Sequence, residues 1–170
     1  DRVAVQLVAL EGSTTVIERG SDDEEFSDYY LTGFAGTSRE RLNYSKLSST
    51  YIAVEGDGDF DIEFVEGFSR GGTGAVVTVT DNVTGEIVEQ FYIVIYGDIN
   101  GDGQITGVDS GLLAEEVLKP DWSSRRTKIP YMVKAADLNG DTKITGIDTG
   151  LLNSVVLGAT IDQQTGEVEE

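Results

Sequence analysis

Two stretches of the chain carry nearly the same sequence: DINGDGQITGVD at residues 98–109 and DLNGDTKITGID at residues 137–148. Oxygen-bearing side chains occupy positions 1, 3, 5, 9 and 12 of both stretches. The same helix start follows each of them, Ser110-Gly111-Leu112-Leu113 after the first and Thr149-Gly150-Leu151-Leu152 after the second. The chain therefore contains a duplicated unit of loop plus helix, and we call residues 98–109 loop one and residues 137–148 loop two.

The spacing of these oxygens suits calcium. Calcium takes six to eight oxygen ligands at about 2.3–2.6 Å, and a twelve-residue loop supplies them from positions 1, 3, 5, 7, 9 and 12, with position 7 using its backbone carbonyl. An Asp/Asn/Gly-rich turn without metal is the alternative, and the duplication with matching helices argues against it. The sequence predicts two calcium ions, held by Asp98, Asn100, Asp102, Gln104 and Asp109 in loop one and by Asp137, Asn139, Asp141, Lys143 and Asp148 in loop two.

The two loops differ at position 6, which requires a sharp turn. Loop one has Gly103 there, whereas loop two has Thr142. A β-branched residue with positive φ costs about 1–2 kcal/mol in backbone strain. We therefore expect loop two to bind calcium more weakly than loop one.

A duplicated calcium loop and helix, with Asp at position 12 and a strand-like segment (Gln90–Tyr96) before the first loop, resembles a dockerin. The resemblance covers roughly residues 97–159. It implies calcium-dependent binding of a cohesin module, which would attach the parent protein to a cellulosome-type scaffold or to the cell surface. It also implies that loop positions 10 and 11 and the following helix face contact the partner. The residues expected there are largely apolar: Val108, Gly111, Leu112, Ile147, Gly150 and Leu151.

The first 96 residues read as β-structure. Short segments rich in β-branched and aromatic residues alternate with Gly, Ser, Asp and Glu, which is typical of strands joined by turns. The expected strands lie at residues 3–8, 14–17, 29–31, 50–54, 60–65, 75–80 and 86–96. The predicted fold is mixed: an all-β Ig-like sandwich at 1–96 followed by a small all-α dockerin at 97–170, an arrangement that resembles an X-module–dockerin pair. The repeats are expected at about 98–119 and 137–158, and residues 160–170 as a frayed polar tail.

The two predicted helices are expected at about residues 108–119 and 147–157. Their apolar positions are divided between core and partner. We assign Leu113, Val117, Leu152 and Val156 to the core and leave Leu112 and Leu151 for the partner; the alternative is that all six are core.

Composition limits the possible functions. The net charge of −19 argues against nucleic acid and anionic membranes as partners, and the chain has no run of apolar residues long enough to cross a membrane. There is no His and no Cys, so we expect a non-catalytic protein. Weak calcium loops suit the millimolar calcium outside cells, so a secreted or cell-surface location in a bacterium is expected. The second candidate is a carbohydrate-binding module joined to a dockerin, with Tyr29, Tyr30, Tyr44 and Tyr51 as its aromatic residues.

Overall fold

The computed structural model describes residues 6–19, 29–34, 47–56, 58–65, 72–118 and 132–169. We call the described residues up to Tyr96 the β-part and those from Gly97 onward the loop–helix part. The β-part contains β1 (Gln6–Ala9), β2 (Val16–Glu18), β3 (Tyr30–Thr32), a π-helical turn η1 (Leu47–Tyr51), β4 (Ile52–Glu55), β5 (Phe60–Val65), β6 (Val76–Asp81) and β7 (Ile87–Ile93). The loop–helix part contains α2 (Gly107–Val117), α4 (Met132–Ala136), α5 (Gly146–Val156), β8 (Thr160–Ile161) and β9 (Val168–Glu169).

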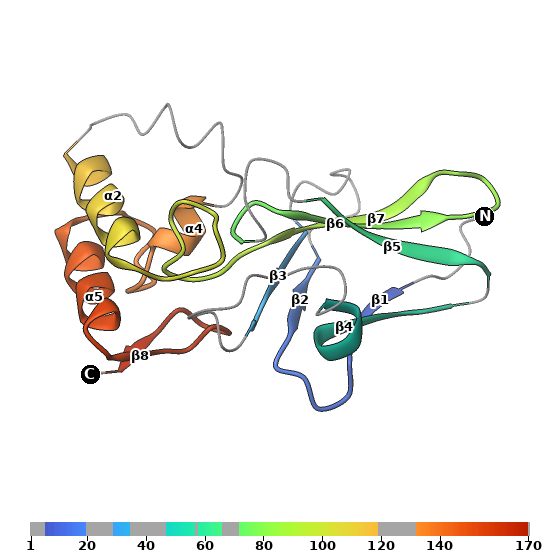
Figure 1. Ribbon diagram of the computed structural model, residues 1–170, viewed down its shortest axis with the longest axis horizontal. Coiled ribbons are helices and arrows are strands. Elements are labelled where there is room, and N and C mark those ends of the chain that lie inside the picture. The colour runs from blue at the N-terminus through green and yellow to red at the C-terminus, as the bar shows by residue number, and fades with distance from the viewer. Residues whose placement is uncertain are drawn as a thin grey trace.

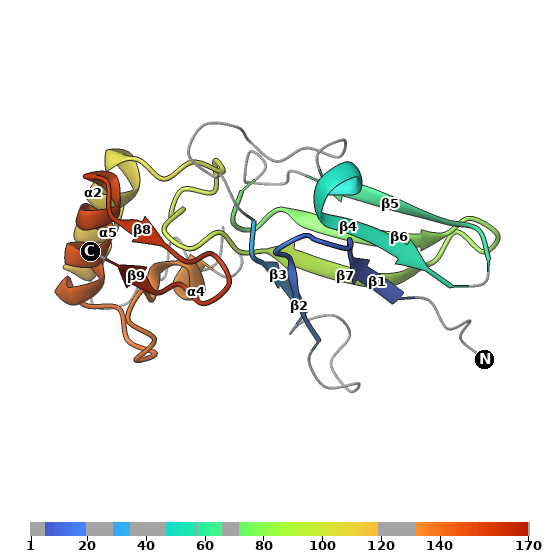
Figure 2. The ribbon, with the colours of Figure 1, turned by 90° about the horizontal axis from the view of Figure 1, so that it is seen from below.

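The strands of the β-part form one large sheet and one small one. The large sheet has the order β2-β3-β7-β6-β5, with β3 parallel to β7 and the other pairs antiparallel. Strands β1 and β4 form a separate antiparallel ladder. Figures 1 and 2 show that the long strands β5, β6 and β7 lie at one end of an elongated molecule and that α2 and α5 lie at the other end.

The core of the β-part lies between the small ladder and the large sheet. Leu7 of β1 and Ile52 of β4 are fully buried with Val77, Phe91 and Ile93 of the large sheet. Burial of each such side chain contributes about 1.5–3 kcal/mol. Figure 1 shows β1 and β4 below β6 and β7, as this shared core requires.

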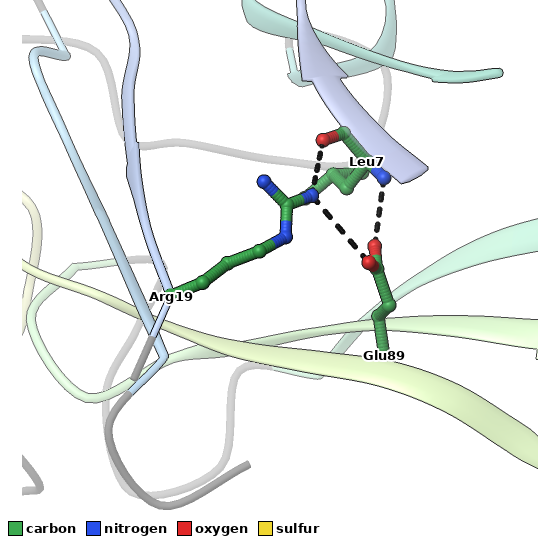
Figure 3. A network of polar contacts seen from close by, with 3 residues as sticks. All are labelled: Leu7, Arg19 and Glu89. Atoms are coloured by element: carbon green, nitrogen blue, oxygen red, sulfur yellow. Dashed lines mark hydrogen bonds and ion pairs between the residues drawn. The ribbon is translucent and has the colours of Figure 1, made fainter. Parts of the chain in front are cut away.

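A buried carboxylate joins the ladder to the large sheet (Figure 3). Glu89 of β7 accepts a hydrogen bond from the Leu7 amide through Oε2, at 2.7 Å. Arg19 donates to the Leu7 carbonyl at 2.7 Å and pairs with Glu89 Oε1 at 3.4 Å. The Arg19 guanidinium also lies 5.4 Å from the centre of the Phe91 ring. Arg19 therefore compensates the buried charge of Glu89. Together the two side chains bind both backbone groups of Leu7.

The fold class predicted from the sequence is wrong, although the N-terminal part does consist of β-strands as expected. The β-part is not an Ig-like sandwich of two antiparallel sheets, because five of its strands form one mixed sheet and only two remain for the second layer. The loop–helix part is not all-α, because it contains the hairpin β8–β9 beside three short helices. Local alternation of side chains locates strands, but the parallel pairing of β3 with β7 depends on contacts between distant segments.

A second core holds the loop–helix part together and extends across its boundary with the β-part. Leu113 of α2 and Leu152 of α5 are fully buried in it, together with Val94 and Tyr96 from the end of the β-part. Val117 packs against this core, but Val156, which we had assigned to it, is 37 % exposed. The core thus joins the chain segment before loop one to both repeat helices.

The tail expected to fray forms the hairpin β8–β9, which contacts both parts. In its turn, the buried Gln163 side chain accepts from the Tyr96 amide at 2.8 Å and donates to the Tyr96 carbonyl at 3.0 Å. The Gln163 carbonyl accepts from the Gly33 amide at 2.8 Å, and Gln164 donates to the Thr14 carbonyl at 2.8 Å. The Gln163 side chain thus satisfies the Tyr96 backbone groups that a neighbouring strand would otherwise pair. Residues 160–169 are therefore ordered, and we call them the clasp.

Candidate metal centre

Loop one brings three carboxylates together. Oxygen atoms of Asp98, Asp102 and Asp109 all lie within 4.8 Å of one another. Asp98 and Asp109 are fully buried, and Asp102 is half-buried. No described lysine or arginine forms an ion pair with any of them. Three acidic groups so close together require a cation to be stable when ionised, and an all-oxygen set favours a hard divalent ion.

Backbone amides hold the first carboxylate of loop one. Asp98 Oδ1 accepts from the amides of Gly101 and Asp102, at 3.0 and 3.2 Å. Its Oδ2 accepts from the amide of Gly103 at 2.9 Å and from that of Thr73, in the β-part, at 3.0 Å. The loop is therefore curled around this one side chain, as a chelating loop must be.

The last carboxylate of each loop also begins a helix. Asp109 Oδ2 accepts from the amide of Thr106, the N-cap of α2, while the Thr106 hydroxyl accepts from the Val108 amide at 3.2 Å. Thr145 and Asp148 repeat this capping box at the start of α5. A capping box satisfies amides that a helix leaves free at its N-terminus. The same geometry turns a carboxylate of position 12 back toward its loop.

Loop two repeats the cluster in a more open setting. Oxygens of Asp137, Asp141 and Asp148 also lie within 4.8 Å of one another. Only Asp148 is buried, whereas Asp141 is exposed and Asp137 half-buried. Thr142 has φ of +66°, the only described residue other than glycine with positive φ, while Gly103 at the same position of loop one has φ of +82°. Thr142 therefore has the positive φ at which a β-branched residue is strained.

The remaining predicted ligands lie in equivalent places in the two loops. Asn100 accepts from the Asp102 amide at 3.1 Å and donates to the Asp102 side chain at 3.3 Å. Asn139 makes the same two contacts to Asp141, both at 3.2 Å. Gln104 and Lys143 each donate a backbone amide to the preceding carboxylate at 2.9 Å. The two loops therefore share one internal network despite their different surroundings.

Burial changes the proton affinity of loop one. Removal from water raises the pKa of Asp98 to about 7, outweighing the amides of Thr73 and Gly103 that donate to it. Burial also raises the pKa of Asp109, against the amides of Thr106, Asn100 and Ile99. Both shifts describe carboxylates with no cation beside them, and such carboxylates bind a divalent ion in competition with protons.

The positions expected to contact a partner are unequally exposed. Val108 is 59 % exposed and Ile147 is 62 % exposed, and Gly111 and Gly150 are also exposed. Leu112 and Leu151 are half-buried and pack against the second core. Of the six expected positions, the exposed apolar side chains are therefore Val108 and Ile147, at the N-terminal ends of α2 and α5. Leu118 and Leu157, at the C-terminal ends of the same helices, are also exposed.

Sequence reasoning missed three residues outside the repeats that support loop one or the segment before it. Gly72 and Thr73 lie against loop one, and Gln163 holds Tyr96, two residues before Asp98. No motif marks them, because their role depends on long-range contacts. A run of small residues at 71–74 was the one available signal of close backbone approach.

Three of the four tyrosines considered for sugar binding pack against other side chains. Tyr51 is buried and packs edge-on against Phe34 at 5.1 Å. Tyr29 packs against Phe91 at 5.2 Å, and Lys134 of α4 lies 4.5 Å from the Tyr30 ring centre. Tyr44 lies outside the described residues.

Comparison with protein-family models finds a match that lies almost entirely within the loop–helix part. Residues 96–157 match the family model described as Dockerin type I domain. No curated protein and no solved structure matches the chain. Among the described residues, no helix has the length and apolar character needed to cross a membrane. Dockerin domains bind calcium and cohesin modules and are themselves non-catalytic, and the match supports a dockerin domain at residues 96–157 of this chain.

Proposed function

We propose that this chain is a non-catalytic adaptor in which residues 97–170 bind a cohesin module when both loops hold calcium. Residues 1–96 act as its supporting β-module, as in an X-module–dockerin pair. The observation that carries the proposal is the pair of three-carboxylate clusters, each in a capped loop, within the segment that matches a dockerin domain. Attachment to a bacterial cellulosome-type scaffold or cell surface follows from such an interaction.

Each loop has the ligands for one calcium ion. In loop one these are the side chains of Asp98, Asn100, Asp102 and Asp109 with the Gln104 carbonyl. In loop two they are Asp137, Asn139, Asp141 and Asp148 with the Lys143 carbonyl. Bound calcium supplies positive charge that removes the repulsion within each cluster. Since each position-12 aspartate caps a helix, calcium orders α2 and α5 relative to their loops.

The partner surface is apolar and lies at the starts of the two repeat helices. Val108 and Ile147 are its exposed anchors, and Gly111 and Gly150 allow a flat partner to approach the helix backbones. Leu112 and Leu151 contribute the edges that the core leaves accessible. Contact through exposed apolar anchors is the usual source of affinity at protein interfaces.

A binding assay against a panel of cohesin modules tests this function. We expect at least one cohesin to bind in calcium and to lose binding in chelator. Val108→Asp and Ile147→Asp locate the surface, and Val83→Asp, exposed in the β6–β7 turn, is the matched control. Failure of every cohesin to bind in calcium would contradict the adaptor function, and unchanged binding by the double variant would contradict the proposed surface.

A further inference from the structure

One strand connection of the β-part touches the first calcium loop. The amide of Thr73 donates to Asp98 Oδ2 at 3.0 Å, and both groups are buried. The same oxygen accepts from the Gly103 amide at 2.9 Å. A ligand side chain of loop one is therefore held on one side by its own loop and on the other by the β-part.

This connection is itself fixed to the end of β7. The Thr73 hydroxyl donates to the Ile95 carbonyl and accepts from the Ile95 amide, each at 3.1 Å. Gly74 donates to the Ile93 carbonyl at 2.9 Å, and Ala75 donates to the Gly72 carbonyl at 3.0 Å. Ile95 lies three residues before Asp98. The hydrogen bonds of Thr73 to Ile95 therefore hold the Thr73 amide beside Asp98 when the loop forms.

Gly72 allows the close approach. A Cβ atom at this position would collide with Asp98 Oδ2, the Gly103 nitrogen and the Gly101 carbonyl carbon. Gly72 does not have positive φ, so space and not backbone conformation requires a glycine there. Two of the three atoms are backbone atoms of the turn around Asp98 and cannot move aside without opening the loop.

Loop two has no such support among the described residues. Asp137, the counterpart of Asp98, accepts from the amides of Gly140 at 3.1 Å and Thr142 at 2.8 Å, both within its own loop. Loop two therefore serves as an internal reference for the effect of the β-part on loop one.

We propose that Gly72 and Thr73 form a positioning segment for loop one, which makes calcium affinity at that loop depend on the β-part. This inference rests on the proposed function, since it concerns the same metal. The Thr73 amide orients the Asp98 carboxylate before calcium arrives, and outer partners that orient metal ligands typically change affinity by about 10–100-fold. By thermodynamic linkage, calcium in loop one stabilises the 72–75 connection to the same extent.

Calorimetric calcium titration of the full chain tests the segment. Asp102→Asn and Asp141→Asn, each disabling one loop, assign the two affinities. In Gly72→Ala we expect a loss of about tenfold or more at loop one and no change at loop two. Val83→Ala is the control from the same β-part, because Val83 is 83 % exposed in the β6–β7 turn. Thr73→Val removes the anchor to Ile95 and should weaken loop one, while Thr73→Ser, which keeps the hydroxyl, restores it.

Hydrogen exchange on the unmodified chain gives a second readout that needs no variant to fold. The Thr73 amide should exchange about tenfold more slowly in calcium than in chelator. By linkage, this factor should equal the factor by which the Thr73 contact raises calcium affinity at loop one. Equal losses at both loops in Gly72→Ala, or unchanged Thr73 exchange, would overturn the inference while leaving the calcium function intact. Absence of calcium uptake by the unmodified chain would instead overturn the proposed function.

Discussion

Loop one and loop two have almost the same sequence and share most of their internal hydrogen bonds, but they lie in different surroundings. Asp98 is fully buried against the β-part. Its counterpart Asp137 is half-buried, and among the described residues its side chain accepts hydrogen bonds only from its own loop. Position 6 is Gly103 in one loop and Thr142 with φ of +66° in the other. A duplicated motif thus gives two sites whose properties are set by their neighbours as much as by their ligands.

The largest difference should follow from removing the first ligand of each loop. Asp98→Asn should weaken calcium binding at loop one by about a hundredfold, or about 2.7 kcal/mol, because a buried carboxylate ligand is lost. It should also lower the melting temperature in calcium, since α2 is capped from the same loop. Calorimetry and thermal unfolding measure both effects.

The matched variant in loop two is Asp137→Asn. It should affect only the second calorimetric step and lower the melting temperature less, because fewer buried groups depend on that loop. Equal effects of the two variants on both steps would mean that the loops bind calcium as one unit.

Acid should weaken loop one before other parts of the chain. Burial raises the pKa of Asp98 to about 7, so calcium must displace a proton below that pH. We expect affinity at loop one to fall about tenfold for each unit of pH below 7. In the metal-free chain the pH dependence of folding stability has the opposite sign. The raised pKa of Asp98 stabilises the folded state fully below about pH 4, and this stabilisation is lost as the pH rises through 7.

Two measurements check this dependence. Titrations at pH 5, 6, 7 and 8 should show proton release on calcium binding that disappears in Asp98→Asn. Unfolding in chelator should show lower stability at pH 8 than at pH 5 from this group. Proton release that persists in Asp98→Asn would assign the titration to another residue.

The clasp beside loop one should also matter for stability. Gln163→Ala leaves the buried amide and carbonyl of Tyr96 without partners, which should cost about 1–3 kcal/mol. Denaturant unfolding with and without calcium measures this cost, and Gln164→Ala, which removes one exposed contact to Thr14, is the control. If both variants lose the same small amount, the hairpin β8–β9 does not hold the two parts together.

The smallest effect should come from the strained turn of loop two. Thr142→Gly should raise calcium affinity at that loop by about fivefold, since a glycine adopts positive φ without the roughly 1 kcal/mol cost of a β-branched side chain. Thr142→Asn should give part of this gain, because asparagine tolerates the same conformation. A gain at loop one instead of loop two would rule out the strain explanation.

The local features of this protein could be predicted from its sequence. The spacing of aspartates and asparagines predicted two carboxylate clusters, and the structure brings together Asp98, Asp102 and Asp109 in one and Asp137, Asp141 and Asp148 in the other. It also predicted helices after both loops, which begin one residue earlier than expected, at Gly107 and Gly146. Such features are readable because a loop or a cap is formed by residues within twelve positions of one another.

How these pieces meet could not be read from local sequence patterns. The mixed sheet, with β3 parallel to β7, replaced the expected sandwich, and the expected frayed tail became a hairpin that binds Tyr96 through Gln163. The contact of Thr73 with Asp98 joins residues 25 positions apart, and no local pattern specifies it. Contacts of this kind depend on which buried surfaces and backbone groups satisfy one another once the chain is compact, so they set apart two loops that the sequence makes nearly equal.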